Sequence, residues 1–229
     1  DGTLVCLTPG ESISMKENNK EFPSKGWILA FHPDLICGTP LGLNIHNYTF
    51  FSYCPEEALH LSLREKQIIL EFLERIRQEL ERCIDRHSKK IISKYIELLL
   101  DYCTRFYERQ FITRSEVNKK VFREFNHLLD NHFNVKVSLS TDVLSDEYCA
   151  NLLHLSPAYF NDLLKYEIGK EFKEYIQFKR FEIAKGWLVN TDKTIGQIAQ
   201  ELGFSNSQYF SRLFKKITGC SPNEFRMPN

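Results

Sequence analysis

The most regular apolar pattern in the chain lies in residues 195–226 and predicts two short helices joined by a tight turn. Thr194 and Gln197 form a capping box that starts the first helix. Gly203 supplies the positive backbone dihedral that a tight turn needs. The second helix follows Ser205, its expected N-cap. Its inward positions recur at the spacing of one helix face: Phe210, Leu213, Phe214 and Ile217.

The opposite face of this second helix is entirely polar. Its side chains can only form hydrogen bonds or carry positive charge: Gln208, Ser211, Arg212 and Lys215. Glutamine suits the edge of adenine, arginine suits guanine, and Lys215 with Lys216 suits phosphates. The alternative is an ordinary solvated helix face, which the stripe alone does not exclude.

An approximate copy of this motif lies upstream, beyond Asp142. The pattern at residues 150–156 recurs at 199–205, and that at 159–169 recurs at 209–219. In the first copy, Ser156 and Pro157 are an N-cap and a first helical residue. The outward positions of the first copy are Ala158, Asn161, Asp162 and Lys165. A long helix over 172–189 has apolar positions on two faces and can pack against both copies.

Asp162 stands where the second copy has Arg212. A carboxylate repels phosphate and can only accept a hydrogen bond, for example from cytosine. The first copy is therefore the weaker reader electrostatically, or it is only a scaffold repeat.

The first 60 residues show short apolar and aromatic runs rather than helical spacing. These runs, at 4–7, 27–31 and 48–53, predict β-structure with loops. So few strands cannot close a barrel or sandwich. We expect either that earlier strands precede this sequence or that the sheet is a remnant packed on the following helices. The chain begins at Asp1 without Met or a signal-peptide pattern, and we expect it to be a fragment of a longer protein.

Residues 61–116 change to helical spacing, with helices expected over 61–83 and 88–107. On the second helix, five apolar positions alternate steps of three and four, as in a two-helix seam: Ile92, Tyr95, Leu99, Tyr102 and Phe106. We predict that this stripe mediates dimerisation, with packing inside one domain as the alternative. The segment 108–116 is expected to separate this pair from a helix over 118–133, and a domain boundary is placed there.

Charge distribution and cysteine content further limit the class of protein and the kinds of site that we expect. The 229 residues have a formal net charge of zero, which by itself argues against a nucleic-acid binder. However, residues 193–229 carry five basic and two acidic side chains, whereas 142–192 carry six and nine. The seven cysteines and seven histidines are scattered, so we expect no disulfide framework, metal or other cofactor. No run approaches the ~18 apolar residues of a membrane helix, so we expect a cytoplasmic protein with no membrane partner.

The C-terminal part resembles the DNA-binding domain of the AraC/XylS family of bacterial transcription regulators. The match is carried by Tyr175, Arg180, Ala184 and Leu188, by Ile195, Ile198, Ala199, Leu202, Gly203 and Phe204, by the run 209–216, and by Gly219, Ser221, Pro222, Phe225 and Arg226. The upstream part is more loosely similar to a truncated cupin-like sensor domain followed by a helical pair that mediates dimerisation in relatives.

The resemblance implies an α+β, mainly α fold in three parts. These are a cupin-like β remnant (1–60), a dimerisation or linker pair (61–116) and an all-α domain (117–229) with seven helices and two helix-turn-helix units. The units would read successive major-groove segments. By position, the DNA-binding residues are Asn206, Ser207, Gln208, Ser211, Arg212, Lys215 and Lys216 in the second unit, and Ala158, Asn161, Asp162 and Lys165 in the first.

We therefore expect a sequence-specific transcription regulator, such as an activator, rather than an enzyme. Its expected partners are double-stranded promoter DNA, a second copy of the chain, RNA polymerase and a small-molecule effector sensed by the N-terminal domain. The alternative function is a cupin-type small-molecule-binding or metal-dependent protein whose helical domain oligomerises. That alternative needs a His/Glu cluster on strands, where only His32 and His46 are expected to lie.

Overall fold

The computed structural model describes residues 2–11, 26–134 and 144–227, which form two compact units. The N-terminal unit is Asp1–Ser115 and the C-terminal unit is Glu116–Asn229. Each unit has a hydrophobic core of its own.

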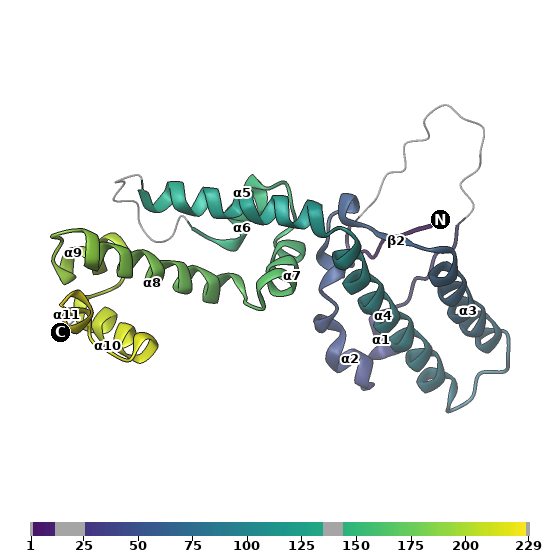
Figure 1. Ribbon diagram of the computed structural model, residues 1–229. Coiled ribbons are helices and arrows are strands. Elements are labelled where there is room, and N and C mark those ends of the chain that lie inside the picture. The colour runs from purple at the N-terminus through teal and green to yellow at the C-terminus, as the bar shows by residue number, and fades with distance from the viewer. Residues whose placement is uncertain (1, 12–25, 135–143, 228–229) are drawn as a thin grey trace. The chain divides into compact units, whose positions relative to one another are not determined.

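The N-terminal unit is mainly helical (Figure 1). Its elements are β1 (Gly2–Leu4), α1 (Pro33–Ile36), α2 (Pro40–Asn44), the 3₁₀ helices η1 (Ile45–Asn47), η2 (Thr49–Ser52) and η3 (Pro55–Glu57), β2 (Leu59–Leu61), α3 (Leu63–Leu80) and α4 (Ser88–Thr113). The two strands pair antiparallel, with Thr3 opposite His60. Helices α3 and α4 lie side by side in Figure 1. They share one hydrophobic core with side chains from the segment that precedes them, such as Leu41, Phe50 and Leu59.

The strand expected over residues 48–53 is wrong, because this segment forms η2. Its aromatic side chains pack onto α4 instead of pairing in a sheet. Phe50 is buried and stacks on Tyr107 with ring centroids 5.4 Å apart. Tyr53 meets the same ring edge-on at 5.1 Å. The cupin-like remnant is not confirmed, since the described part of residues 1–61 holds only two three-residue strands.

Helix α4 is longer than expected and leaves almost no separating segment. It runs to Thr113, and α5 (Ser115–Asn134) begins after Arg114 alone. The reason is that Tyr107, Gln110 and Phe111 continue the buried face. The Gln110 amide ties α4 to the sheet, because it accepts from the His60 N–H at 2.8 Å and donates to the Ala58 carbonyl at 3.2 Å.

The stripe predicted to mediate dimerisation lies in the core of the N-terminal unit. Ile92, Leu99 and Phe106 are buried, and Tyr95 and Tyr102 pack against the same cluster. These side chains therefore make the contact within one domain that was the alternative. Tyr102, for example, lies 5.3 Å from the Phe72 ring of α3.

The C-terminal unit is all helical in its described residues and holds the seven helices that the resemblance implies. They are α5, α6 (Asp146–Leu152), α7 (Pro157–Ile168), α8 (Phe172–Asn190), α9 (Ile195–Glu201), α10 (Ser207–Thr218) and α11 (Pro222–Arg226). The short helix α11 has the capping box that Ser221 and Glu224 form.

Helix α8 joins two separate clusters of apolar side chains, as its two apolar faces predict. Its first half gives Phe172, Tyr175 and Ile176 to a cluster with α5 to α7. Its second half gives Phe181 and Leu188, among others, to a cluster with α9 to α11. In Figure 1, α7 lies at one end of α8 and α9 to α11 lie at the other. One helix therefore packs against both helix-turn-helix units.

Candidate nucleic-acid interface

The second helix-turn-helix unit is α9, the turn that contains Gly203, and α10. Thr194 Oγ1 accepts from the Gln197 N–H at 3.2 Å, and Gln197 Oε1 accepts from the Thr194 N–H at 2.8 Å, so the predicted capping box is confirmed. Gly203 has φ 74°, the left-handed conformation expected of the turn. Phe210 and Phe214 anchor α10, since both are fully buried.

The N-cap of α10 is Asn206 and not the expected Ser205. Asn206 Oδ1 accepts from the Tyr209 N–H at 2.7 Å. The second copy has one residue more than the first before its recognition helix, so the cap moves along by one. Because the Asn206 oxygen is used in the cap, only its amide N–H groups remain to donate to DNA.

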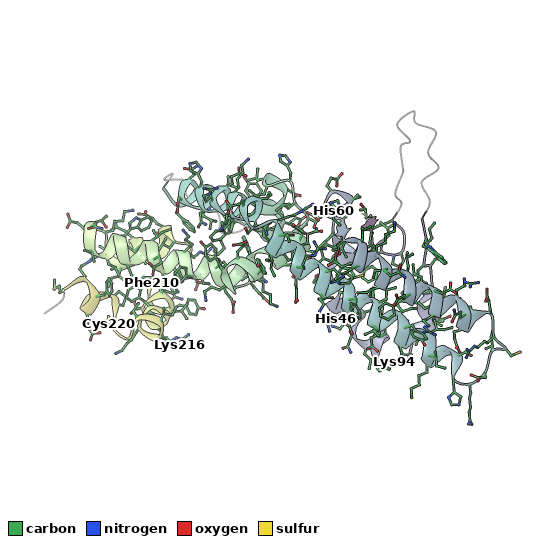
Figure 2. The ribbon with its side chains drawn as sticks, turned by 45° about the vertical axis from the view of Figure 1, so that its right-hand side comes forward. His46, His60, Lys94, Phe210, Lys216 and Cys220 are labelled. Carbon is green, nitrogen blue, oxygen red and sulfur yellow. The ribbon has the colours of Figure 1, made fainter. Side chains whose placement is uncertain are left out.

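The predicted polar stripe of α10 faces solvent. Asn206, Ser207, Gln208, Arg212, Lys215 and Lys216 are exposed, and Ser211 is half-buried. Figure 2 labels Phe210 and Lys216, which represent the buried and the exposed side of α10. Within the described chain, Arg212, Lys215 and Lys216 form no ion pair. Their positive charge is therefore available to a polyanion.

Tyr209 is part of this surface, although the sequence reasoning did not select it. Its ring is 40% exposed, and the Arg212 guanidinium carbon lies 5.7 Å from the ring centroid. A cation over an aromatic face is attracted to it, which restricts the orientations of the arginine. The spacing of three between an aromatic residue and an arginine on one helix is the signal that could have indicated this pair.

The first helix-turn-helix unit is α6, a turn and α7. Ser156 caps α7 by accepting from the Tyr159 N–H at 3.2 Å, as predicted. At the position equivalent to Gly203, this unit has His154, which adopts φ 56°. A side chain in that conformation is strained, so the first turn is less favourable than the second.

The outward face of α7 exposes fewer polar side chains than the outward face of α10. Lys165 is exposed, whereas Ala158, Asn161 and Asp162 are half-buried. The Asn161 amide is already engaged, because Nδ2 donates to Asp146 Oδ2 and to the Pro157 carbonyl, both at 3.0 Å. The two units thus present different chemistry on equivalent helices.

The residues required by a cupin-type metal site do not come together in the described structure. His32 caps α1, where its Nδ1 accepts from the Asp34 N–H at 3.2 Å, and His46 lies in η1, so neither is on a strand. Across the described residues, no three His, Cys, Asp or Glu side chains are grouped to hold a metal ion. In the same part of the chain, no helix combines the length and apolar character needed to span a membrane.

Two helix-turn-helix units that pack on one helix, one of them with an exposed cationic second helix, are the features of a DNA-binding domain. Comparison with known proteins agrees: residues 149–227 match the family described as "Helix-turn-helix domain". The resemblance of the C-terminal unit to the AraC/XylS family of transcription regulators is confirmed over these residues.

Three curated relatives illustrate the match. The uncharacterized HTH-type transcriptional regulator YtdP of Bacillus subtilis is 33% identical over 111 residues, 48% of this chain and 14% of YtdP. The arabinose operon regulatory protein of Salmonella typhimurium is 33% identical over 101 residues, 44% of this chain and 32% of that protein. The uncharacterized HTH-type transcriptional regulator YijO of Escherichia coli is 24% identical over 225 residues, 98% of this chain and 76% of YijO.

Among solved structures, the C-terminal domain of AraT, a response regulator from Geobacillus stearothermophilus, is 34% identical. The alignment covers 46% of this chain and 83% of that domain, with a TM-score of 0.40.

The chain spans well under half of the length of two of the curated relatives, 14% of YtdP and 32% of the arabinose operon regulatory protein.

Proposed function

We propose that this protein regulates transcription by reading two successive major-groove segments of promoter DNA with α7 and α10. The observation that carries the proposal is the exposed stripe of α10, where Arg212, Lys215 and Lys216 form no salt bridge within the described chain. These cations lie on the second helix of a helix-turn-helix, which is the helix that enters the major groove in proteins with this motif.

The roles of the side chains follow from their chemistry. Arg212 donates to guanine O6 and N7, and Gln208 exchanges hydrogen bonds with adenine. Lys215 and Lys216 neutralise phosphates. Ser207, Ser211 and the Asn206 amide donate to neighbouring phosphates or base edges. Arg212 is pre-oriented by Tyr209, so less conformational entropy is lost when it binds.

Two recognition helices on one support constrain the DNA. Adjacent major-groove segments on one face of straight B-DNA lie about 34 Å apart. Since α8 packs against both units, the distance between the two recognition helices is set by the protein. Where this distance does not match the groove spacing of straight DNA, the DNA must bend, at a cost of ~1–6 kcal/mol. We therefore expect a bent complex, with the stronger electrostatic contact at the second unit.

The test is a selection of bound sequences from random double-stranded DNA, using the full chain. Wild type should enrich one motif with a guanine that Arg212→Ala no longer selects. Arg123→Ala is the matched control, because Arg123 is an exposed arginine on α5 of the same unit. Failure of wild type to enrich any sequence, or identical motifs from wild type and Arg212→Ala, would contradict the proposal.

Homodimerisation stays a prediction, and the buried stripe suggests that other residues of α4 would make the contact. Ile91 and Leu98 are 37% and 44% exposed and line a shallow hollow of about 610 Å³ with Tyr95. Lys94 and Asp101 border the same hollow, and Figure 2 labels Lys94. An antiparallel pair of α4 helices would place Lys94 opposite Asp101 of the second copy, which gives the face charge self-complementarity.

Sedimentation of two neighbouring variants tests this arrangement. Leu98→Arg should give a folded monomer, whereas Leu99→Arg should unfold the unit because Leu99 is buried. A Leu98→Arg protein that dimerises like wild type, or a monomeric wild type, would contradict it. Response to an effector through the N-terminal unit and contact with RNA polymerase stay predictions.

A further inference from the structure

The amide of Asn161 is held in one orientation by two hydrogen bonds. Its Nδ2 donates to Asp146 Oδ2 on α6 and to the carbonyl of Pro157 on α7, at 3.0 Å each. Both partners can only accept, so the nitrogen and not the oxygen of the amide must face them. The two N–H groups of Asn161 are therefore both used within the protein.

Only Asn161 Oδ1 remains for DNA, and it is an acceptor. Recognition of adenine by asparagine requires one N–H donated to N7 and one oxygen accepting from N6. An amide whose donors are both engaged cannot make that pair. It can accept one hydrogen bond from an exocyclic amino group, which cytosine and adenine offer in the major groove and guanine and thymine do not.

The carboxylate that holds Asn161 is itself fixed. Asp146 Oδ1 accepts from the Glu147 backbone N–H at 3.1 Å, while Oδ2 accepts from Asn161. Asp146 is the first residue of α6, and Ser145 before it caps that helix. The hydrogen bond therefore joins the N-terminus of α6 to the N-terminal half of α7.

We propose that Asp146 is a specificity-determining positioning residue: by holding the Asn161 amide, it makes the first unit select a base with a major-groove amino group over guanine or thymine. This inference rests on the proposed reading of DNA by α7. Asp162, one residue further along α7, can likewise only accept hydrogen bonds when ionised.

The second unit provides an internal contrast. In the repeat, Ser211 takes the place of Asn161 and Ile195 takes the place of Asp146, so no carboxylate holds the equivalent side chain. Its reading stripe has the donor Arg212 where the first has Asp162. At positions 161 and 162 the first unit thus offers acceptors to bases, whereas the second unit offers the donor Arg212 at the position equivalent to Asp162.

The test measures the affinity of the full chain for duplexes that differ at one base pair under the first unit. With wild type, cytosine or adenine should bind at least threefold more tightly than guanine or thymine. Asp146→Ala frees the Asn161 amide to rotate, so adenine should gain relative to cytosine through the bidentate pair. Asp146→Asn keeps an acceptor oxygen and should retain the wild-type preference.

A double variant separates positioning from a structural role. Since Asp146 acts through Asn161, Asp146→Ala combined with Asn161→Ala should show the same base preference as Asn161→Ala alone. An unchanged preference in Asp146→Ala, or a further change in the double variant, would overturn the inference. If wild type shows no base preference at any position, the proposed function is overturned. If Arg212→Ala still changes the base preference under the second unit, the proposed function stands even when the inference about Asp146 fails.

Discussion

The packing of Phe210 allows us to predict how much this side chain stabilises the second helix-turn-helix unit. This side chain is fully buried, and its ring centroid lies 5.0 Å from Phe204, 5.6 Å from Phe214 and 6.2 Å from Phe181. Removing a buried phenylalanine loses ~2–3 kcal/mol of transfer free energy. Lost aromatic pairing and the remaining cavity bring the total into the range of ~3–5 kcal/mol. Phe210→Ala should therefore lower the free energy of unfolding by about 4 kcal/mol.

The chain contains a suitable probe for this measurement. Trp187 packs against the same cluster, and the other tryptophan, Trp27, is exposed in the N-terminal unit. In a Trp27→Phe background, urea denaturation followed by fluorescence reports the second unit alone. With a slope of ~1–3 kcal/mol per molar urea, Phe210→Ala should move the midpoint by about 2 M.

Ile217 supplies the matched control on the same helix. It was expected on the inward face of α10, but it is 54% exposed because it lies one turn beyond Phe214, at the end of the helix. Ile217→Ala should move the midpoint by less than about 0.3 M. Equal shifts for the two variants would refute the assigned core.

Four further predictions concern two turns, the salt dependence of DNA binding and the pH dependence of stability. Gly203→Ala should destabilise the second unit by ~1–2 kcal/mol in the same denaturation assay, since Gly203 has φ 74°. At the equivalent turn, His154→Gly should not destabilise the first unit. Lys215→Ala should weaken binding to all DNA sequences and reduce the slope of log affinity against log salt by about 0.9, measured by titration at several salt concentrations. The Ser221 N–H holds the pKa of Glu224 below its usual range, so this stabilisation is complete above the ordinary carboxyl pKa and is lost as the pH falls through the lowered value. The thermal midpoint of Glu224→Gln should accordingly depend less on pH in acid than that of wild type.

The parts of the fold that the sequence predicted correctly depend on local signals. The capping box at Thr194, the turn at Gly203 and the spacing of Phe210 and Phe214 act within a few residues, so they locate helices and turns without knowledge of the tertiary structure. The repeat added the first unit by analogy with the second. The role of α8 followed from its two apolar faces.

The errors arose where a pattern has more than one physical solution. An aromatic run such as 48–53 can pair in a sheet or pack onto a helix, and here Tyr107 of α4 supplies the partner. Periodicity identified an apolar stripe on α4 but could not tell whether α3 or a second chain covers it. The segment 108–116 was expected to separate two helices, but it contains neither Pro nor Gly, and α4 continues through it to Thr113.

Within the candidate interface, the exposed side chains of α10 were predictable from their spacing, but one hydrogen bond and one backbone conformation were not. The hydrogen bond between Asp146 and Asn161 joins residues on different helices, so no spacing rule indicates it. His154 adopts φ 56° where the second unit has glycine, and only alignment of the two turns would have pointed to it.

The central claim is that Arg212 on α10 reads a base, and one titration tests it most directly. The affinities of wild type and Arg212→Ala are compared on the selected site and on a site whose critical guanine is replaced. Wild type should prefer the guanine site by ~1–3 kcal/mol, and Arg212→Ala should lose this preference. If Arg212→Ala weakens both sites equally and keeps the preference for guanine, Arg212 contacts only phosphate and the account is contradicted.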